Sequence, residues 1–353
     1  MLKVAHLKLT LLIVPLILLY ACGGDDITTT NPGPNNPGTN NDWLVDNSLV
    51  FDGGPGKDGI PSVDSPRFTK ATDVDFLTPN ALVLGIRVGN EVRAYPHPIL
   101  DWHEIVNDDY DNGASIALTY CPLTGTGVGW DRNVDGVKTT FGVSGLLYNT
   151  NLMPFDRATD SYWSQLRLDC VNGSNIGERA GIHSFVEMSW ETWLAAYPDS
   201  DVLNTDTGFS RNYTQYPYGD YRTNHQNIIF PITNDDPRLP RKERVLGVIT
   251  DEGQKTYPFH PAVDGPDMIV DTLGALPLTI VSDKTRNYMV AFEMTGLELL
   301  DESEFPLIVQ DADGAKYDVL GNGPSGQLPL PEQFIGYWFA WATFYADIPL
   351  YER

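Results

Sequence analysis

The chain has few cysteines, few histidines and few basic residues. Its 353 residues include three Cys, six His and 23 Lys and Arg against 47 Asp and Glu, which gives a formal net charge of −24 at pH 7. Nucleic acid and anionic membrane surfaces repel so negative a chain, and we therefore expect no nucleic-acid partner. So few cysteines also exclude a disulfide-rich scaffold.

Several catalytic motifs are absent as well. The sequence has no Gly-x-x-x-x-Gly-Lys-Ser/Thr loop, no Gly-x-Ser-x-Gly elbow, no His-Glu-x-x-His pair and no dinucleotide fingerprint after a predicted strand. The chain therefore lacks the usual signatures of P-loop, serine-hydrolase, zinc-protease and dinucleotide-binding proteins. The sequence therefore predicts no particular cofactor and does not show whether the protein is an enzyme.

The one long apolar run lies at the N-terminus. Two lysines precede the run from Leu9 to Leu19, which is too short for a comfortable bilayer span. We interpret residues 1–21 as a secretory signal peptide and Cys22 as the lipid acceptor of a bacterial lipoprotein. Residues 22–42, rich in Asn, Gly, Pro and Thr, predict a flexible linker. A protein in the bacterial cell envelope is expected, lipid-anchored in the membrane and facing the periplasm or the cell exterior.

Several short segments of the sequence recur in similar form at a fixed spacing. VLGI at 83–86 returns as VLGV at 245–248, and position 245 lies 162 positions after position 83. Tyr95-Pro96 returns at the same spacing as Tyr257-Pro258. A Trp-x-x-Trp-x-x-x-Tyr-x-Asp pattern starts at 190 and again at 338, which lies 148 positions after 190. These echoes predict an internal duplication whose second copy is shorter.

The fold class expected from these patterns is α+β and mainly β. β-rich runs at 82–88 and 92–95 flank a glycine-containing hairpin loop, and an apolar run at 116–120 predicts a buried strand. Residues 101–107 are expected to form one or two helical turns. The aromatic stripes after 189 and after 337 predict two core-facing helices.

Two related lobes follow from the duplication. The first is expected over residues 43–240 and contains the candidate site and a long ordered insertion at 205–240. The second, shorter lobe is expected over residues 241–353. Binding residues often lie on such long ordered loops.

Cys121, His103 and Glu104 are the candidate catalytic residues. Cys121 follows the strand-like run at 116–120, and neither it nor His103 has a counterpart in the second copy. A thiolate is a nucleophile that a neighbouring imidazolium favours, and Glu104 or Asn107 could orient that ring. The alternative is a structural role, in which Cys121 is an inert buried thiol and His103 is a hydrogen-bonded core residue.

Polar side chains crowd the stretches that follow Cys121. They can line a pocket that binds a small molecule. These candidate ligand-binding residues are Asn107, Thr124, Thr126, Ser144, Tyr148, Asn149, Asn151, Asp156, Arg157, Trp163, Ser164 and Gln165.

Three boxes resemble one family. YCPLTGT at 120–126, WHEIVND at 102–108 and FGVSGLLYNTNLMPFDRATDSYWSQ at 141–165 resemble the uncharacterised prokaryotic family called domain of unknown function 3179. The resemblance spans about Asp58 to Tyr351 and implies an extracytoplasmic protein, often lipid- or membrane-anchored, without an assigned activity. The family box usually reads Cys-Pro-Leu-Cys-Gly-Thr. Thr124 stands at its second cysteine, so a Cys-x-x-Cys pair is not available there.

Two alternatives to thiol chemistry stay open. In one, Cys121 and Cys170 form a structural disulfide, and the protein is a non-catalytic binding or scaffold protein of the envelope. In the other, His103 and Cys121, with His97 and Met153, form a soft copper site. The primary hypothesis is a small-ligand pocket at Cys121 and His103.

Overall fold

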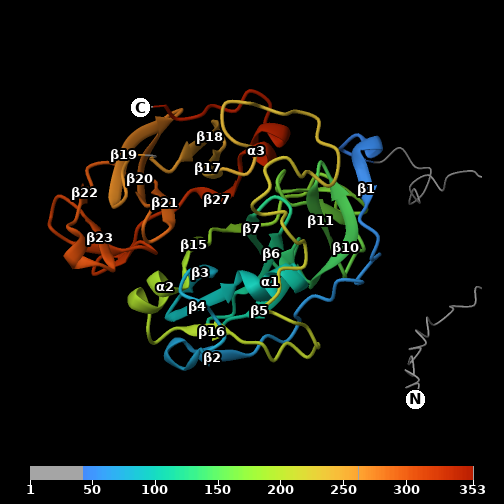
Figure 1. The fold of residues 1–353 in the computed structure, drawn as a ribbon, viewed down its shortest axis with the longest axis horizontal. Helices are drawn as coiled ribbons and strands as arrows, with labels where there is room; N and C mark the ends of the chain where they lie inside the picture. Colours follow the sequence, from blue (N-terminus) through green and yellow to red (C-terminus); the bar gives the residue numbers. More distant parts are fainter. Residues whose placement is uncertain (1–42, 261, 353) are drawn as a thin grey trace, which may run out of the picture. The chain divides into compact units, whose positions relative to one another are not determined.

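Strands dominate the fold, as the sequence predicts. The computed structural model describes residues 43–260 and 262–352, and this part of the chain contains 27 strands but only three α-helices (Figure 1). The predicted signal peptide 1–21, the lipidation site Cys22 and the linker 22–42 lie outside the described residues. The mainly β fold class is therefore confirmed.

Three larger sheets and a small hairpin form the N-terminal part. One sheet has the order β1 (Val50–Asp52), β10 (Phe141–Tyr148), β11 (Asn151–Asp156), β12 (Tyr162–Ser164), β13 (Asp169–Asn172). The second has the order β14 (Ile182–His183), β7 (Thr126–Asp131), β6 (Ser115–Cys121), β5 (Ile105–Asp109). The third has the order β15 (Val186–Ser189), β3 (Leu82–Val88), β4 (Glu91–Pro96), β16 (Asp201–Leu203), β2 (Phe68–Lys70). The hairpin is β8 (Asn133–Val134) with β9 (Val137–Lys138).

Smaller antiparallel sheets form the C-terminal part. Their strand orders are β18 (Gly253–Pro258), β17 (Arg244–Thr250), β27 (Glu332–Tyr337); then β19 (Pro266–Leu273), β20 (Leu276–Asp283), β21 (Tyr288–Phe292); then β22 (Glu298–Leu299), β23 (Leu307–Gln310), β24 (Lys316–Asp318); and β25 (Asn322–Gly323) with β26 (Gly326–Gln327). The 204–243 segment between β16 and β17 contains no helix or strand, although all of it is described, which agrees with the predicted long loop.

The three helices are α1 (His97–His103), α2 (Trp190–Ala196) and α3 (Trp338–Phe344). None of these helices, in the described part of the chain, is long and apolar enough to cross a membrane. The Ser189 side chain accepts a hydrogen bond from the Thr192 backbone N–H and so caps α2. Three 3₁₀ turns, η1 (Asn47–Leu49), η2 (Ala71–Asp73) and η3 (Glu302–Glu304), complete the described elements.

The helical turns predicted for 101–107 are displaced in the structure. Helix α1 begins at His97, because Pro98 lies in its first turn, where the missing N–H costs no hydrogen bond. It ends at Glu104, which has a left-handed backbone with φ of 58°. The chain then enters β5 at Ile105, so the second half of the predicted helix is a strand.

Equivalent elements recur along the chain at the two spacings that the sequence shows. β3 runs over 82–88 and β17 over 244–250, and position 244 lies 162 positions after 82. β4 and β18 start at 91 and 253, again 162 positions apart. Helix α2 starts at 190 and α3 at 338, which lies 148 positions after 190. In both halves the helix follows a strand that pairs antiparallel with the first strand of the hairpin, β15 with β3 and β27 with β17.

The hydrophobic core is shared between the two halves. One cluster of buried residues contains Cys121 and Trp163 from the first half together with Phe334 and Trp341 from the second. A second cluster joins Trp193 to Val290 and other residues of the C-terminal part. All of the described residues belong to one compact unit. The first half therefore builds its site against residues that arrive late in the sequence.

Candidate functional site: a thiol and a carboxyl on one small cavity

Cys121 ends strand β6 as a free thiol. Its side chain is buried, with 1% of the residue exposed. The Leu152 backbone N–H donates to Sγ at 3.4 Å, and Sγ lies 3.8 Å from the Thr150 carbonyl oxygen. Pro122 cannot continue the strand ladder because it has no N–H. The sulfur is therefore held against the tip of the β10–β11 hairpin.

The disulfide that the sequence allows between Cys121 and Cys170 is not formed. Both cysteines are free and buried. Cys170 lies in β13, where its thiol is 3.3 Å from the carbonyl oxygens of both Tyr162 and Asn172. Its sulfur thus contacts its own strand and the neighbouring β12, while the Cys121 sulfur faces the β10–β11 hairpin.

Cys121 and Glu104 both line a small cavity of about 70 Å³. Glu104 follows α1 immediately, and its left-handed backbone is uncommon for a residue with a side chain. Such strain concentrates at functional sites. The remaining wall is mostly apolar and comprises Gly53, Pro55, Ile60, Leu123, Val143, Gly145, Leu146, Leu147, Leu152, Tyr218 and Phe230.

Burial sets the protonation of both reactive groups. It raises the pKa of Glu104 to about 7; the hydrogen bond from Tyr218 opposes this, and the nearby Asp101 adds to it. Burial likewise raises the pKa of the Cys121 thiol to about 11, and the charge of Glu104 is the next largest cause. At neutral pH the cavity therefore holds a neutral thiol beside a carboxyl that is close to half-protonated.

The long 204–243 segment closes the cavity. Tyr218 and Phe230 from this segment line it, and the Tyr218 hydroxyl donates to Glu104 Oε1 at 3.0 Å. Arg222 from the same segment pairs with Asp101 at 2.5 Å and stacks on Tyr216 at 4.1 Å from the ring centroid. Asp101 of α1 and Glu104 at its C-cap thus hold the 204–243 segment in place through Arg222 and Tyr218.

His103 does not join Cys121. Its Nδ1 lies 2.7 Å from the Pro61 carbonyl oxygen and its Nε2 lies 2.7 Å from the Tyr213 hydroxyl. The Tyr213 hydroxyl in turn lies 2.6 Å from Thr207 Oγ1. A chain of hydrogen bonds from Thr207 through Tyr213 and His103 to the Pro61 carbonyl oxygen gives both ring nitrogens a partner. Of the candidate catalytic residues, Cys121 and Glu104 line the cavity and His103 does not.

Four predicted ligand-binding residues instead form a closed internal network. Thr126 Oγ1 donates to Gln165 Oε1 at 2.7 Å, and Asn151 Nδ2 donates to Gln165 Oε1 at 2.7 Å and to Thr124 Oγ1 at 2.9 Å. Gln165 Nε2 donates to the Thr119 carbonyl oxygen at 3.0 Å. These side chains already have partners, so their role here is to tie β6, β7 and β11 together.

The other predicted ligand-binding residues have structural contacts or no contact with the cavity. Asn107 bonds to Phe141 and to Asp64, Arg157 holds the 58–64 loop through Asp58, and Asp156 accepts from Trp163 Nε1 at 3.0 Å. Ser144 donates to the Met153 carbonyl oxygen, and Tyr148 lies edge-on to Phe344. Asn149 Oδ1 and Ser164 Oγ are buried and have no hydrogen-bond partner among the described residues. None of these side chains lines the cavity.

The predicted copper ligands are not gathered into a site. Within the described residues, no group of three or more His, Cys, Asp and Glu could hold a metal ion. Both nitrogens of His103 are used as described above. His97 lies instead 2.9 Å from Glu187 Oε2 and stacks on Tyr120.

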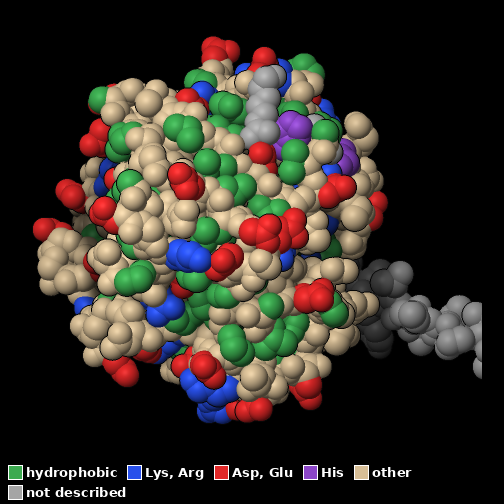
Figure 2. All heavy atoms as spheres, turned by 90° about the vertical axis from the view of Figure 1, so that its left-hand side faces the viewer, with side chains coloured by type: hydrophobic (Ala, Val, Ile, Leu, Met, Phe, Trp, Pro, Cys, Tyr) green, Lys and Arg blue, Asp and Glu red, His purple; other side chains and the backbone are tan. Residues whose placement is uncertain are grey.

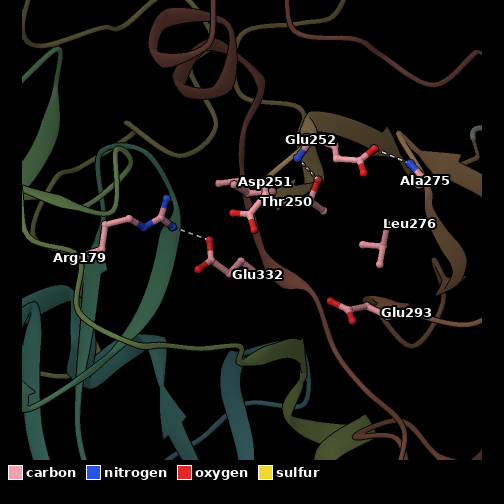
Figure 3. A pocket seen from close by; sticks show the side chains of 9 residues that line it. Arg179, Thr250, Asp251, Glu252, Ala275, Leu276, Glu293 and Glu332 are labelled. Carbon is pink, nitrogen blue, oxygen red and sulfur yellow. Dashed lines mark hydrogen bonds and ion pairs between the residues drawn. The ribbon is translucent and has the colours of Figure 1, made fainter.

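Two wider clefts, each of about 560 Å³, are lined mostly by residues after position 240. Figure 3 shows one of them, in which Arg179 and Glu332 point toward one another, 2.7 Å apart, with Asp251, Glu252 and Glu293 around the opening. Its lining contains no cysteine or histidine. On the face drawn in Figure 2, acidic side chains are distributed over the surface rather than confined to one patch. The second cleft is lined by His260 and, like the first, by no cysteine.

Sequence reasoning named Cys121 and Glu104 but missed Asp101, Tyr218, Arg222 and Phe230. Asp101 stands three residues before Glu104, and this spacing brings side chains together at a helix end. The other three lie in a segment without periodicity, whose run of tyrosines was the only signal. Nothing in the sequence places that segment over Cys121.

Fold and site define a mainly β protein with a buried thiol and carboxyl on one cavity. The model of the family described as "Protein of unknown function (DUF3179)" matches residues 57–348, and the chain belongs to this family. The resemblance predicted from the three boxes is thereby confirmed. A search of curated proteins and a search of solved structures each found no match.

Proposed function

We propose that this protein is a cell-envelope lipoprotein whose first half binds a small ligand in the Cys121 cavity and acts on it through the thiol. The observation that carries the proposal is that Cys121 and Glu104 line the same cavity. Glu104 is 7% exposed, and no cation pairs with it among the described residues. A buried carboxyl of this kind is costly, and such perturbed groups are enriched at functional sites.

Labelling of the thiol tests this function. Methyl methanethiosulfonate and iodoacetamide are added separately to the folded protein, and the modified cysteines are identified by mass spectrometry. Cys121 should react before unfolding, and Cys170, which does not line the cavity, is the internal control. If both cysteines stay unmodified until the chain unfolds, the cavity admits no ligand to the sulfur and the proposal fails.

The alternative is a non-catalytic envelope protein with structural thiols. The low exposure of Cys121 and the hydrogen bond that its sulfur accepts favour this alternative. It predicts that Cys121→Ser keeps every ligand-binding or catalytic activity of the wild type. The thiol proposal predicts loss of that activity with unchanged thermal unfolding.

The envelope location rests on the sequence alone. The signal-like residues 1–21 and Cys22 support a lipid anchor. Metabolic labelling with a fatty acid should mark the wild type and leave Cys22→Ala unlabelled. Labelling of Cys22→Ala to the wild-type level would contradict the anchor.

We also propose that the two halves arose by duplication. The 162-position spacing that β3 and β17 share with β4 and β18 supports it, and so does the order of a hairpin followed by a helix, α2 or α3, in each half. A superposition of residues 82–131 on residues 244–293 should align β3, β4, β5, β6 and β7 with β17, β18, β19, β20 and β21. A different strand order in the two segments would contradict a common origin.

A further inference from the structure

We propose that the Cys121 cavity takes an uncharged carbonyl compound of a few heavy atoms, with its oxygen toward Glu104 and its carbonyl carbon toward the Cys121 sulfur. This proposal rests on the small-ligand function proposed above and names the class of ligand.

The size and lining of the cavity limit the ligand. A water-sized group needs roughly 10–15 Å³ of such volume, so about 70 Å³ holds roughly five of them. Leucine, valine, isoleucine and phenylalanine side chains make most of the wall. A ligand that fills this space is therefore small and largely apolar, and its polar atom can bond to Glu104, Tyr218 or Cys121.

The contacts of Glu104 leave one carboxyl oxygen available to the ligand. Tyr218 donates to Oε1, and Oε2 has no hydrogen-bond partner among the described residues. Glu104 carries the only acidic side chain on the cavity wall, and no basic residue lines it. A proton on Oε2 has nowhere to be donated within the protein and can be donated to a ligand oxygen.

Arg222 favours a negative charge on Asp101, the carboxyl three residues before Glu104. Its guanidinium pairs directly with Asp101, whereas Glu104 receives only a phenol hydroxyl. Two buried carboxyls three residues apart disfavour simultaneous ionisation. Burial raises the pKa of both carboxyls to about 7, and Arg222 opposes this rise at Asp101. The protonated form of Glu104 is therefore a donor to a ligand in the cavity.

Charged ligands fit this cavity poorly. An anion would meet apolar walls and, whenever Glu104 ionises, a like charge. A cation could pair with ionised Glu104 but would lose its hydration shell against leucine side chains. A neutral carbonyl group matches both the donor and the walls.

A carbonyl also gives the thiol a reaction that needs no other reagent. The sulfur bonds to the carbonyl carbon while the π electrons of the C=O bond move to the oxygen. That oxygen takes the proton of Glu104, and the resulting carboxylate takes the proton that the thiol loses. The product is a hemithioacetal when the ligand is an aldehyde, and Glu104 is restored to its starting form.

The test compares three probes of the same carbon skeleton on the full chain. Propanal, propanoate and propylamine are each added before iodoacetamide, and the initial rate of Cys121 labelling is measured with Cys170 as the internal reference. The best affinity for four heavy atoms is a Kd on the order of 0.05 mM, so the probes are used at millimolar concentrations. Propanal should slow Cys121 labelling by more than half, and the two charged probes should not.

Two variants of Glu104 distinguish hydrogen-bond donation by this side chain from the space that it fills. Glu104→Ala should lose most of the protection by propanal, whereas Glu104→Gln, whose amide N–H can donate, should lose less. Equal or stronger protection by propanoate or propylamine, or no protection by propanal while Cys121 is labelled normally, overturns the ligand class. Absence of any Cys121 labelling in the folded chain without probes overturns the proposed function itself, so the two failures are distinguishable.

Discussion

Gly85 lies against the indole ring of Trp193, and a Cβ atom placed on Gly85 would come within 1.8 Å of Trp193 Cζ3. The second half repeats the relationship, since a Cβ on Gly247 would come within 2.0 Å of Trp341 Cζ2. Each glycine lies in the first strand of a hairpin, and each tryptophan lies on the helix that packs across it. Close approach of the ring, rather than backbone freedom, requires glycine at both positions.

Gly85→Ala and Gly247→Ala should therefore each destabilise the fold. The added methyl group has no room beside a fully buried indole, and overpacking of this kind costs typically ~1–3 kcal/mol. Chemical denaturation followed by tryptophan fluorescence measures the loss. Gly181→Ala is the matched control, because its Cβ would meet Asp131 Cβ only at an ordinary 3.4 Å. Similar stability of the control and the two variants would contradict the packing argument.

Glu104→Gln should stabilise the protein at pH 8. Burial raises the pKa of Glu104 from its ordinary 4.5 to about 7. The folded state therefore holds a proton that the unfolded chain has lost, and stability falls as the pH rises from about 4.5 to about 7. A glutamine has no such loss, and the gain above pH 7 is on the order of 3 kcal/mol.

Thermal unfolding at pH 4 and pH 8 measures this effect. The difference between wild type and Glu104→Gln should be larger at pH 8 than at pH 4, and Glu178→Gln, an exposed glutamate, should show no such change. A Glu104→Gln variant that is less stable than wild type at pH 8 would mean that the carboxylate is paired in the folded state.

The sequence predicts the scaffold better than it predicts the site. The β3–β4 hairpin, the capped helix after Ser189 and the mainly β class follow from local periodicity and turn residues, which are properties of neighbouring positions. Cys121 was singled out because the matching position of the later repeat-like stretch is not a cysteine. His103 and Glu104 are adjacent in sequence, so the sequence does not predict that Glu104 lines the cavity and His103 does not.

The position of the 204–243 segment over the cavity could not be predicted for a different reason. Tyr218 reaches Glu104 across 114 positions of sequence and Arg222 reaches Asp101 across 121. The segment that carries them has no regular secondary structure, so no hydrophobic period reveals which side it buries. The same limit applies to Thr124, Asn151 and Gln165, whose polar character suggested a ligand but whose partners in the fold satisfy one another.

Glu187→Gln should remove an acid-sensitive part of the stability. Arg244 and His97 flank the Glu187 carboxylate, and although burial opposes them, their charges lower its pKa to about 2 from an ordinary 4.5. The stability this adds is present above about pH 4.5 and is lost as the pH falls from there toward 2. Its size is on the order of 3 kcal/mol. Denaturation between pH 2 and pH 6 should show a shallower acid slope in the variant, and an identical slope would exclude Glu187 as its source.

Lys242→Met should loosen the segment that covers the cavity. The Lys242 ammonium donates to the backbone carbonyl oxygens of Tyr221, Asn224 and Asn227, and it lies 3.3 Å from the centroid of the Tyr221 ring. Methionine fills similar space but leaves buried carbonyl groups without this donor, at a cost of ~1–3 kcal/mol for each that stays unpaired. Lys316→Met, which removes an exposed ion pair with Glu304, is the control and should change stability by less than ~1 kcal/mol.

Amide hydrogen exchange shows which part of the chain loses stability in Lys242→Met. Because Lys242 holds the same segment that carries Tyr218 and Arg222, amide exchange in 215–230 should accelerate in Lys242→Met more than exchange in β17 or β27. Iodoacetamide labelling of Cys121 should accelerate with it, since Tyr218 and Phe230 form part of the cavity wall. If exchange in 215–230 accelerates and Cys121 labelling does not, the segment is not the barrier between the sulfur and solvent.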